Sequence, residues 1–130
     1  PAPTTTPAPT TTPAPTTTPA PTTTPAPTTT PAPGPDTTDP TVEIVSPANW
    51  STVSGTTAVR AAASDDVGVT AVRFFSGATQ LGVATRVDGY WELVYDSRQT
   101  PNGNYRVAAR AYDAAGNVGY STSIAIMVRN

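Results

Sequence analysis

An all-β sandwich preceded by a disordered tail is the architecture that the 130-residue sequence predicts. Thirteen of the 16 prolines lie in residues 1–35, where Ala supplies the only aliphatic side chains. Residues 36–130 have a normal globular share of apolar side chains, which alternate with polar ones at the two-residue period of strands. No segment repeats apolar residues at helical spacing, so we expect no helix.

The tail, residues 1–35, repeats PAPTTT five times without error and then continues into the variant PAPGPD. It has too little apolar surface to offset the entropy of an ordered chain. Proline fixes φ and favours extended neighbours, which predicts a polyproline-II-like linker that reaches on the order of 110 Å when fully extended. A proline-rich docking motif and an O-glycosylated stalk are the alternatives.

The strands of residues 36–130 follow from short alternating runs separated by turns. Val42 and Ile44 alternate with polar neighbours until Pro47 breaks the run, and Asp88-Gly89 is typical of a two-residue hairpin. About seven strands in roughly 90 residues predict an immunoglobulin-type sandwich of antiparallel sheets. The expected core consists of Ile44, Val59, Ala61, Val72, Phe74, Leu81, Trp91, Leu93, Tyr105, Val107, Ala109, Ile124 and Ile126.

Tyr105 follows Gly103 and Asn104 at the start of the sixth expected strand. A tyrosine at this place can turn its hydroxyl back onto the preceding loop, as in a tyrosine corner. Such a bond would lock the crossover without a disulfide, which this sequence cannot form because it has no Cys.

The composition excludes several kinds of site. Without His or Cys, the chain cannot build a Ser-His-Asp triad, a Cys nucleophile or a zinc finger. Its two glutamates, Glu43 and Glu92, are expected on solvent-facing strand positions, so we expect no glycosidase pair and no catalysis. A net charge of −2 without Lys argues against nucleic-acid binding, and no apolar run is long enough to span a membrane.

Aspartates gather in three segments that an immunoglobulin-type sandwich brings to one end: the residues before the first strand, the loop after the second strand, and the last hairpin. Asp36 lies in the first of these segments. Carboxylate and amide oxygens converging from loops suit calcium. The alternative is that Asp and Asn are there to cap turns and tolerate left-handed backbone. The predicted calcium ligands are Asp39, Asp65, Asp66, Asp113 and Asn117.

Aromatic side chains outside the core are candidates for a carbohydrate platform. Trp50 lies outside any alternation, while Phe75 and Tyr112 are expected to point outward. We therefore predict a carbohydrate site at Trp50, Phe75 and Tyr112, with Tyr90 and Tyr120 as further candidates. The alternative is that outward aromatics stabilise cross-strand pairs.

Four motifs carry a resemblance to a known family: DTTDPTV, SPAN, ASDDVGV and YDAAGNVG, in this order. Between Asp36 and Val128 the sequence resembles the bacterial Ig-like domains of secreted multidomain proteins. Ser76 departs from the pattern, because relatives often have an apolar residue there. The tail resembles the Pro-Thr linkers of secreted bacterial enzymes that degrade polysaccharides.

The resemblance implies a non-catalytic accessory or spacer module of a secreted protein that degrades polysaccharide or protein. We expect a monomer, covalently linked to an upstream domain, with calcium as the one candidate cofactor. Because the first residue already lies inside a repeat, the chain is expected to be a fragment of a longer one. A carbohydrate-binding module that uses exposed aromatics and a cell-surface adhesion repeat stay open as alternatives.

Overall fold

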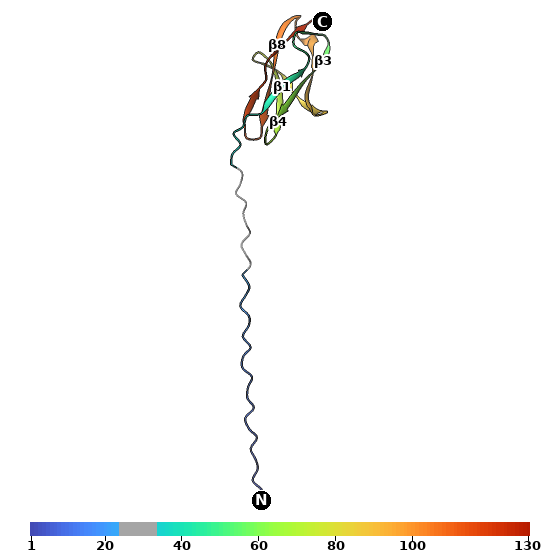
Figure 1. Cartoon of the computed structure of the whole chain (residues 1–130). Helices are drawn as coiled ribbons and strands as arrows, with labels where there is room; N and C mark the ends of the chain where they lie inside the picture. The colour runs from blue at the N-terminus through green and yellow to red at the C-terminus, as the bar shows by residue number, and fades with distance from the viewer. Residues whose placement is uncertain (24–33) are drawn as a thin grey trace. The chain divides into compact units, whose positions relative to one another are not determined.

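The computed structural model describes residues 1–23 and 34–130 (Figure 1). The chain divides into two units, Pro1–Ala32 and Pro33–Asn130. Residues 1–23 form no helix or strand, and all of them are exposed, as their composition leads one to expect. Part of the predicted linker, residues 24–33, lies outside the described residues.

The folded part of the chain, residues 34–130, is built almost entirely of strands, which confirms the predicted all-β class. One three-residue 3-10 turn, η1 (Ser97–Gln99), was not predicted; the Asp96 carboxylate caps it by accepting from the backbone N–H of Arg98 at 3.1 Å. The strands are β1 (Thr41–Ser46), β2 (Ser51–Val53), β3 (Thr56–Ser64), β4 (Val69–Ser76), β5 (Thr79–Val83), β6 (Thr85–Val87), β7 (Tyr90–Asp96), β8 (Gly103–Asp113), β9 (Val118–Tyr120) and β10 (Ile124–Val128).

The strands form two sheets packed face to face, and this confirms the predicted Ig-like sandwich (Figure 1). The smaller sheet has the order β1-β3-β7-β6, and the larger has the order β2-β10-β8-β4-β5 with β9 beside β8. The expectation of purely antiparallel pairing is wrong at one place, where β2 runs parallel to β10. Pro47 divides the expected first strand, and its two halves, β1 and β2, join different sheets.

The core lies between the sheets and matches the predicted one closely. Phe74 and Val72 in the middle of β4 are fully buried, and Trp91 from β7 faces them from the other sheet. Leu81, Leu93, Ile124 and Ile126 are only partly buried and pack against this cluster. The other predicted core residues that are buried are Ile44, Val59, Ala61, Val107 and Ala109, and the cluster also contains Ala84 and Ala111.

Tyr105 is partly buried at the start of β8 and forms the bond that was predicted for it. Its hydroxyl donates to the backbone carbonyl oxygen of Pro101 at 2.8 Å. The loop between η1 and β8 is therefore held by a side chain of β8.

The described residues include no helix that could cross a membrane.

Candidate functional site

Loops far apart in sequence meet at one end of the sandwich. Thr38 Oγ1 donates to Asp66 Oδ2 at 3.2 Å, and Asn117 Nδ2 donates to the backbone oxygen of Asp36 at 3.1 Å. The three segments that the sequence pointed to therefore converge. We call this end the acidic pole, and it consists of residues 36–39, 65–68 and 113–117.

Three carboxylates, those of Asp36, Asp65 and Asp66, bring one oxygen each within 4.8 Å of one another. One oxygen of Asp36 accepts from the backbone N–H of Thr38 at 3.0 Å, and one oxygen of Asp65 accepts from two backbone N–H groups of its own loop at 3.0 and 2.8 Å. The other oxygens, Asp36 Oδ2 and Asp65 Oδ1, are shielded from solvent and have no hydrogen-bond partner. Shielded acceptors without a donor are costly, so this trio has unused capacity to bind a positive group.

The surroundings of the trio shift the pKa of the Asp36 carboxyl group. The backbone N–H of Thr38 stabilises its carboxylate, but burial and the nearby charges of Asp66, Asp65 and Asp113 together raise its pKa above the ordinary value of 3.8. A raised carboxyl pKa means that the folded state disfavours the charged form. A cation placed among these oxygens would remove that penalty.

Asp113 belongs to the same end but has a different role. It is 6% exposed, and its two oxygens accept from the backbone and the side-chain nitrogens of Asn117 at 2.8 and 2.7 Å. Burial opposes its ionisation, but the hydrogen bonds from Asn117 and from the backbone of Gly116 and Ala115 outweigh burial and lower its pKa. Its carboxylate therefore organises the β8–β9 hairpin.

The predicted calcium ligands are thus divided by the structure. Asp65 and Asp66 come together, with Asp36 as the third member of the trio. Asp39 is exposed and lies outside the trio, and Asp113 is engaged by its own hairpin. Asp36 and Asp39 lie in the same short segment, so the sequence offered no signal that ranked one above the other.

The three residues of the predicted carbohydrate platform differ in exposure and surroundings. Trp50 is 67% exposed beside the edge strand β2, and its backbone N–H donates to the oxygen of Ala125. The expectation that Phe75 is an exposed aromatic is wrong: it is 9% exposed, because the Arg110 guanidinium lies 4.1 Å from its ring centre. Tyr112 is partly buried and has the Arg73 guanidinium 4.9 Å from its ring centre.

The two glutamates lie on different strands of the smaller sheet. Glu92 on β7 is ion-paired with Arg60 on β3. Glu43 lies two strands away on β1, where it is exposed. Glycoside hydrolysis needs two carboxyl groups that flank one scissile bond, and the carboxylate of Glu92 is already engaged by Arg60.

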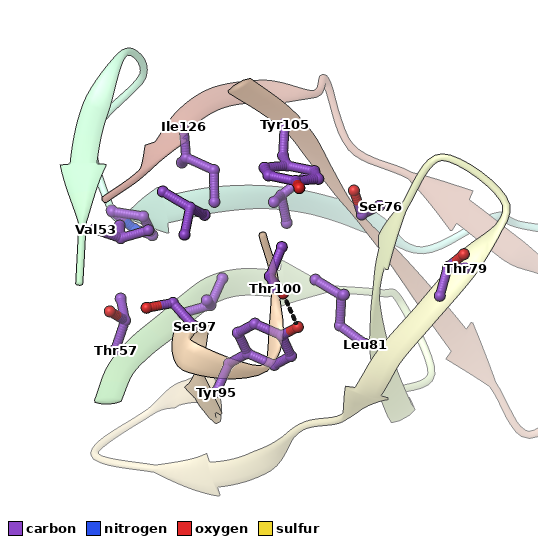
Figure 2. A pocket seen from close by; sticks show the side chains of 14 residues that line it. Val53, Thr57, Ser76, Thr79, Leu81, Tyr95, Ser97, Thr100, Tyr105 and Ile126 are labelled. Atoms are coloured by element: carbon purple, nitrogen blue, oxygen red, sulfur yellow. Dashed lines mark hydrogen bonds between the residues drawn. The ribbon is translucent and has the colours of Figure 1, made fainter. Parts of the chain in front are cut away.

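The opposite end of the sandwich, which we call the distal pole, contains a cavity of about 290 Å³ between the two sheets (Figure 2). Ser76 and Tyr105 line it from one sheet and Tyr95 from the other. The Tyr95 hydroxyl is hydrogen-bonded to Thr100 Oγ1 at 2.5 Å, so both tyrosine hydroxyls are already engaged. No pattern in the sequence predicts a cavity, and the one signal for it is Ser76 at a position where an apolar side chain is usual.

Comparison with known proteins decides the family. A model of the bacterial Ig domain family matches residues 40–109. The chain belongs to the bacterial Ig domain family. This Ig domain is also 38% identical over 84 residues to Exoglucanase B of Cellulomonas fimi, an alignment that covers 65% of the chain and 7% of the exoglucanase.

Two solved structures share the fold. The endo-beta-1,4-mannanase from Thermotoga petrophila superimposes with a TM-score of 0.60 at 18% identity, over 75% of this chain and 21% of the mannanase chain. The fibronectin(III)-like modules of Clostridium thermocellum CbhA superimpose with a TM-score of 0.51 at 23% identity, over 69% of this chain and 45% of that one. At such identities the likeness concerns the fold alone. In both the exoglucanase and the mannanase, the matching region is a small part of a longer protein.

Proposed function

We propose that this bacterial Ig domain is a non-catalytic spacer module of a secreted protein that degrades polysaccharide. The observation that carries the proposal is the match to Exoglucanase B, in which the related region is 7% of the length. A segment that small is a part added to an enzyme, and the present domain has neither His, Cys nor a glutamate pair that could act alone.

The proposed secretion rests on the size of the proposed substrate. Polymeric glucans do not enter cells, so an enzyme that degrades them works outside. The absence of Cys fits a bacterial exported protein that folds without disulfides. On this proposal the partner is a covalently linked catalytic domain.

The junction between tail and domain supports a spacer role. Pro40 is buried just before β1, and its carbonyl oxygen lies where a Cβ on Gly119 would be. Asn117 fixes the Asp36 carbonyl at the same end. These contacts anchor residues 36–40 on the domain.

The reach of the tail tests the spacer role. Fluorescent labels on Thr4→Cys and Asp39→Cys can be placed selectively because the chain has no other Cys. A polyproline-II-like tail gives a mean transfer distance well above the roughly 30–35 Å of a flexible coil and below the ~110 Å of a fully extended chain. The matched control is a Gly-Ser tail of equal length, and a PAPTTT tail that is no longer than this control would contradict the proposal.

Catalysis is tested directly on the same protein. Incubation with cellulose, mannan and casein should release no sugar or peptide. Product release that persists in Glu43→Gln and Glu92→Gln preparations would point to contamination, whereas release abolished by either variant would overturn the non-catalytic assignment.

We also propose that the acidic pole binds one calcium ion through Asp36, Asp65 and Asp66. The observation that favours it is the pair of shielded oxygens, Asp36 Oδ2 and Asp65 Oδ1, which lack any donor although each carboxylate uses its other oxygen locally. Oxygen ligands from two separate segments suit calcium, which tolerates irregular geometry. The ion would join the segment before β1 to the β3–β4 loop and stiffen the junction.

The calcium proposal is tested by thermal unfolding in calcium and in chelator. Wild type should unfold at a higher temperature in calcium, because an ion that binds only the folded state stabilises it. Asp65→Asn combined with Asp66→Asn should abolish this difference, while Asp88→Asn, which removes an exposed aspartate elsewhere, should retain it. Identical wild-type curves in calcium and chelator would refute the site.

A further inference from the structure

The outer face of the six-stranded sheet carries a row of arginines and aromatic rings. Arg73 on β4 lies directly opposite Arg110 on β8, and Arg110 lies directly opposite Tyr120 on β9. Residues on either side of these arginines are fully buried in the core, so the arginines point away from it. We call this surface the arginine face, and it consists of Arg73, Phe75, Arg106, Arg110, Tyr112 and Tyr120.

The positive charge of this face is not neutralised within the domain. In residues 34–130 the ion pairs involve Arg60 and Arg98, neither of which belongs to the face. The outward positions of β4, β8 and β9 carry no Asp or Glu. A chain with a net charge of −2 therefore concentrates three of its seven arginines on one uncompensated surface.

The arrangement has a cost that the fold does not require. Like charges directly opposite on neighbouring strands destabilise a sheet, and Arg73 and Arg110 are such a pair. Either position could hold a neutral side chain without altering the core. The pairing is understandable if an anion is bound between the two strands.

Aromatic rings lie close to the guanidinium groups of Arg73 and Arg110. Arg73 lies over Tyr112 at 4.9 Å, while Arg110 lies 4.1 Å from the ring centre of Phe75 and 5.4 Å from that of Tyr120. Stacking occupies the flat face of a guanidinium and leaves its in-plane N–H donors available. The donors are thus held in place before any ligand arrives, which lowers the entropic cost of binding.

We propose that the arginine face binds an acidic polysaccharide through the carboxylates of its uronic acid residues. A guanidinium matches a carboxylate with two parallel hydrogen bonds. The Tyr120 ring, which is 69% exposed beside Arg110, offers an apolar surface to the C–H groups of a sugar ring. Uronic acid units present both features, a carboxylate and an apolar ring face, along one extended polymer.

A nucleic acid fits this surface less well. Phosphate polymers carry a dense charge and are bound by proteins with extended basic stripes. Here three arginines lie on a domain that is acidic as a whole. The proposal goes beyond the spacer function, which would stand unchanged if this face bound nothing.

The experiment is an NMR titration of the whole ¹⁵N-labelled chain with trigalacturonate. Resonances of β4, β8 and β9 should shift, and binding should weaken strongly at about 0.5 M NaCl because the contacts are exposed and charged. Arg73→Gln should reduce the affinity by about fivefold, the effect of one good ion pair. Tyr120→Ala should also weaken binding, since the sugar ring loses its platform.

Arg86→Gln is the matched control. Arg86 also stacks on an aromatic ring, 5.2 Å from that of Trp91, but on the smaller sheet, so its loss changes the net charge equally and should leave the affinity unchanged. Equal weakening by Arg86→Gln would overturn the proposal in favour of a general charge effect. Equal binding of neutral mannotriose, tighter binding of a short oligothymidylate, or no shifts on β4 and β8 would each overturn it as well.

Discussion

The two ends of the sandwich are held together by different chemistry. At the acidic pole, carboxylates and amides close the structure through short polar contacts, and the backbones of Pro40 and Gly119 touch. At the distal pole, the sheets separate around a cavity of about 290 Å³. One end therefore has a close backbone contact, while the other has space between the sheets.

The distal pole is closed on its outside by Asn130. Its Oδ1 accepts from the backbone N–H of Gly55 at 3.1 Å and from Ser97 Oγ at 2.8 Å, and its Nδ2 donates to the backbone oxygen of Ser97 at 2.8 Å. These bonds connect residues that are distant in sequence but do not fill the space beneath them. Polar bonding can thus close a small sandwich at an end where apolar packing is incomplete. A substitution that adds a methyl group should then harm one end and help the other.

The largest effect is expected for Gly119→Ala at the acidic pole. The new Cβ would overlap the Pro40 carbonyl oxygen, so the segment before β1 must move away from β9. We expect a loss of about 3 kcal/mol, as for overpacking against backbone, measured by urea unfolding. Gly34→Ala, where a Cβ meets no atom, should change stability by less than about 0.5 kcal/mol. Equal stability of Gly119→Ala and wild type would show that the contact is not tight.

The second-largest effect is expected for Asn117→Ala, and it should depend on pH. The lowered pKa of Asp113 means that its charged form stabilises the fold above the ordinary value of 3.8, and that this contribution is lost as the pH falls through and below that value. Without the Asn117 amide the pKa of Asp113 should rise towards its ordinary value. The melting temperature of the variant should therefore be about 5 °C lower at pH 7 than that of the wild type. It should also fall less than the wild-type value when the pH is lowered. Parallel curves of melting temperature against pH would contradict this assignment.

Tyr105→Phe at the distal pole should cost about 1 kcal/mol, because the Pro101 carbonyl loses its hydrogen bond. Chemical denaturation measures the difference. Tyr120→Phe removes a hydroxyl from an exposed ring and serves as the control. A Tyr105→Phe protein that unfolds like wild type would remove the tyrosine corner from the account of stability.

Ser76→Val should stabilise the domain by about 0.5–1 kcal/mol, since the side chain enters the cavity and suits a strand. Ser76→Thr has the same shape with a hydroxyl in place of a methyl group and should gain less. Calorimetry in parallel with Gly119→Ala gives the direct contrast between the two ends. A Ser76→Val protein less stable than wild type would mean that the cavity must stay open or hydrated.

The sequence predicted those features that depend on neighbouring residues. Alternation placed Val72 and Phe74 in the core, and Asp88-Gly89 forms the expected hairpin, with φ angles of 50° and 82°. Tyr105 could be assigned because its partner, Pro101, lies only four residues away.

Features that depend on distant strands could not be predicted. The alternation of side chains along the strand placed Phe75 on the outer face, but its burial depends on Arg110 from another strand. The parallel pairing of β2 depends on Ile126 and its neighbours, far along the chain. The choice of Asp36 over Asp39 depends on the backbone path before β1, and the distal cavity depends on how both sheets diverge. Of these, the cavity alone has a local signal, which is Ser76 at a position where an apolar side chain is usual.

The parallel alignment of β2 with β10 has a mechanical consequence. The domain begins at the acidic pole and its last strand ends at the distal pole (Figure 1). Tension applied across it would pull β2 and β10 along their length in opposite directions, so the bonds of the pairs Ile126–Ser51, Met127–Thr52 and Val128–Val53 would resist together in shear. Bonds strained in parallel rupture at a higher force than bonds peeled apart singly. The fold is thus built to resist extension along the line between its two poles.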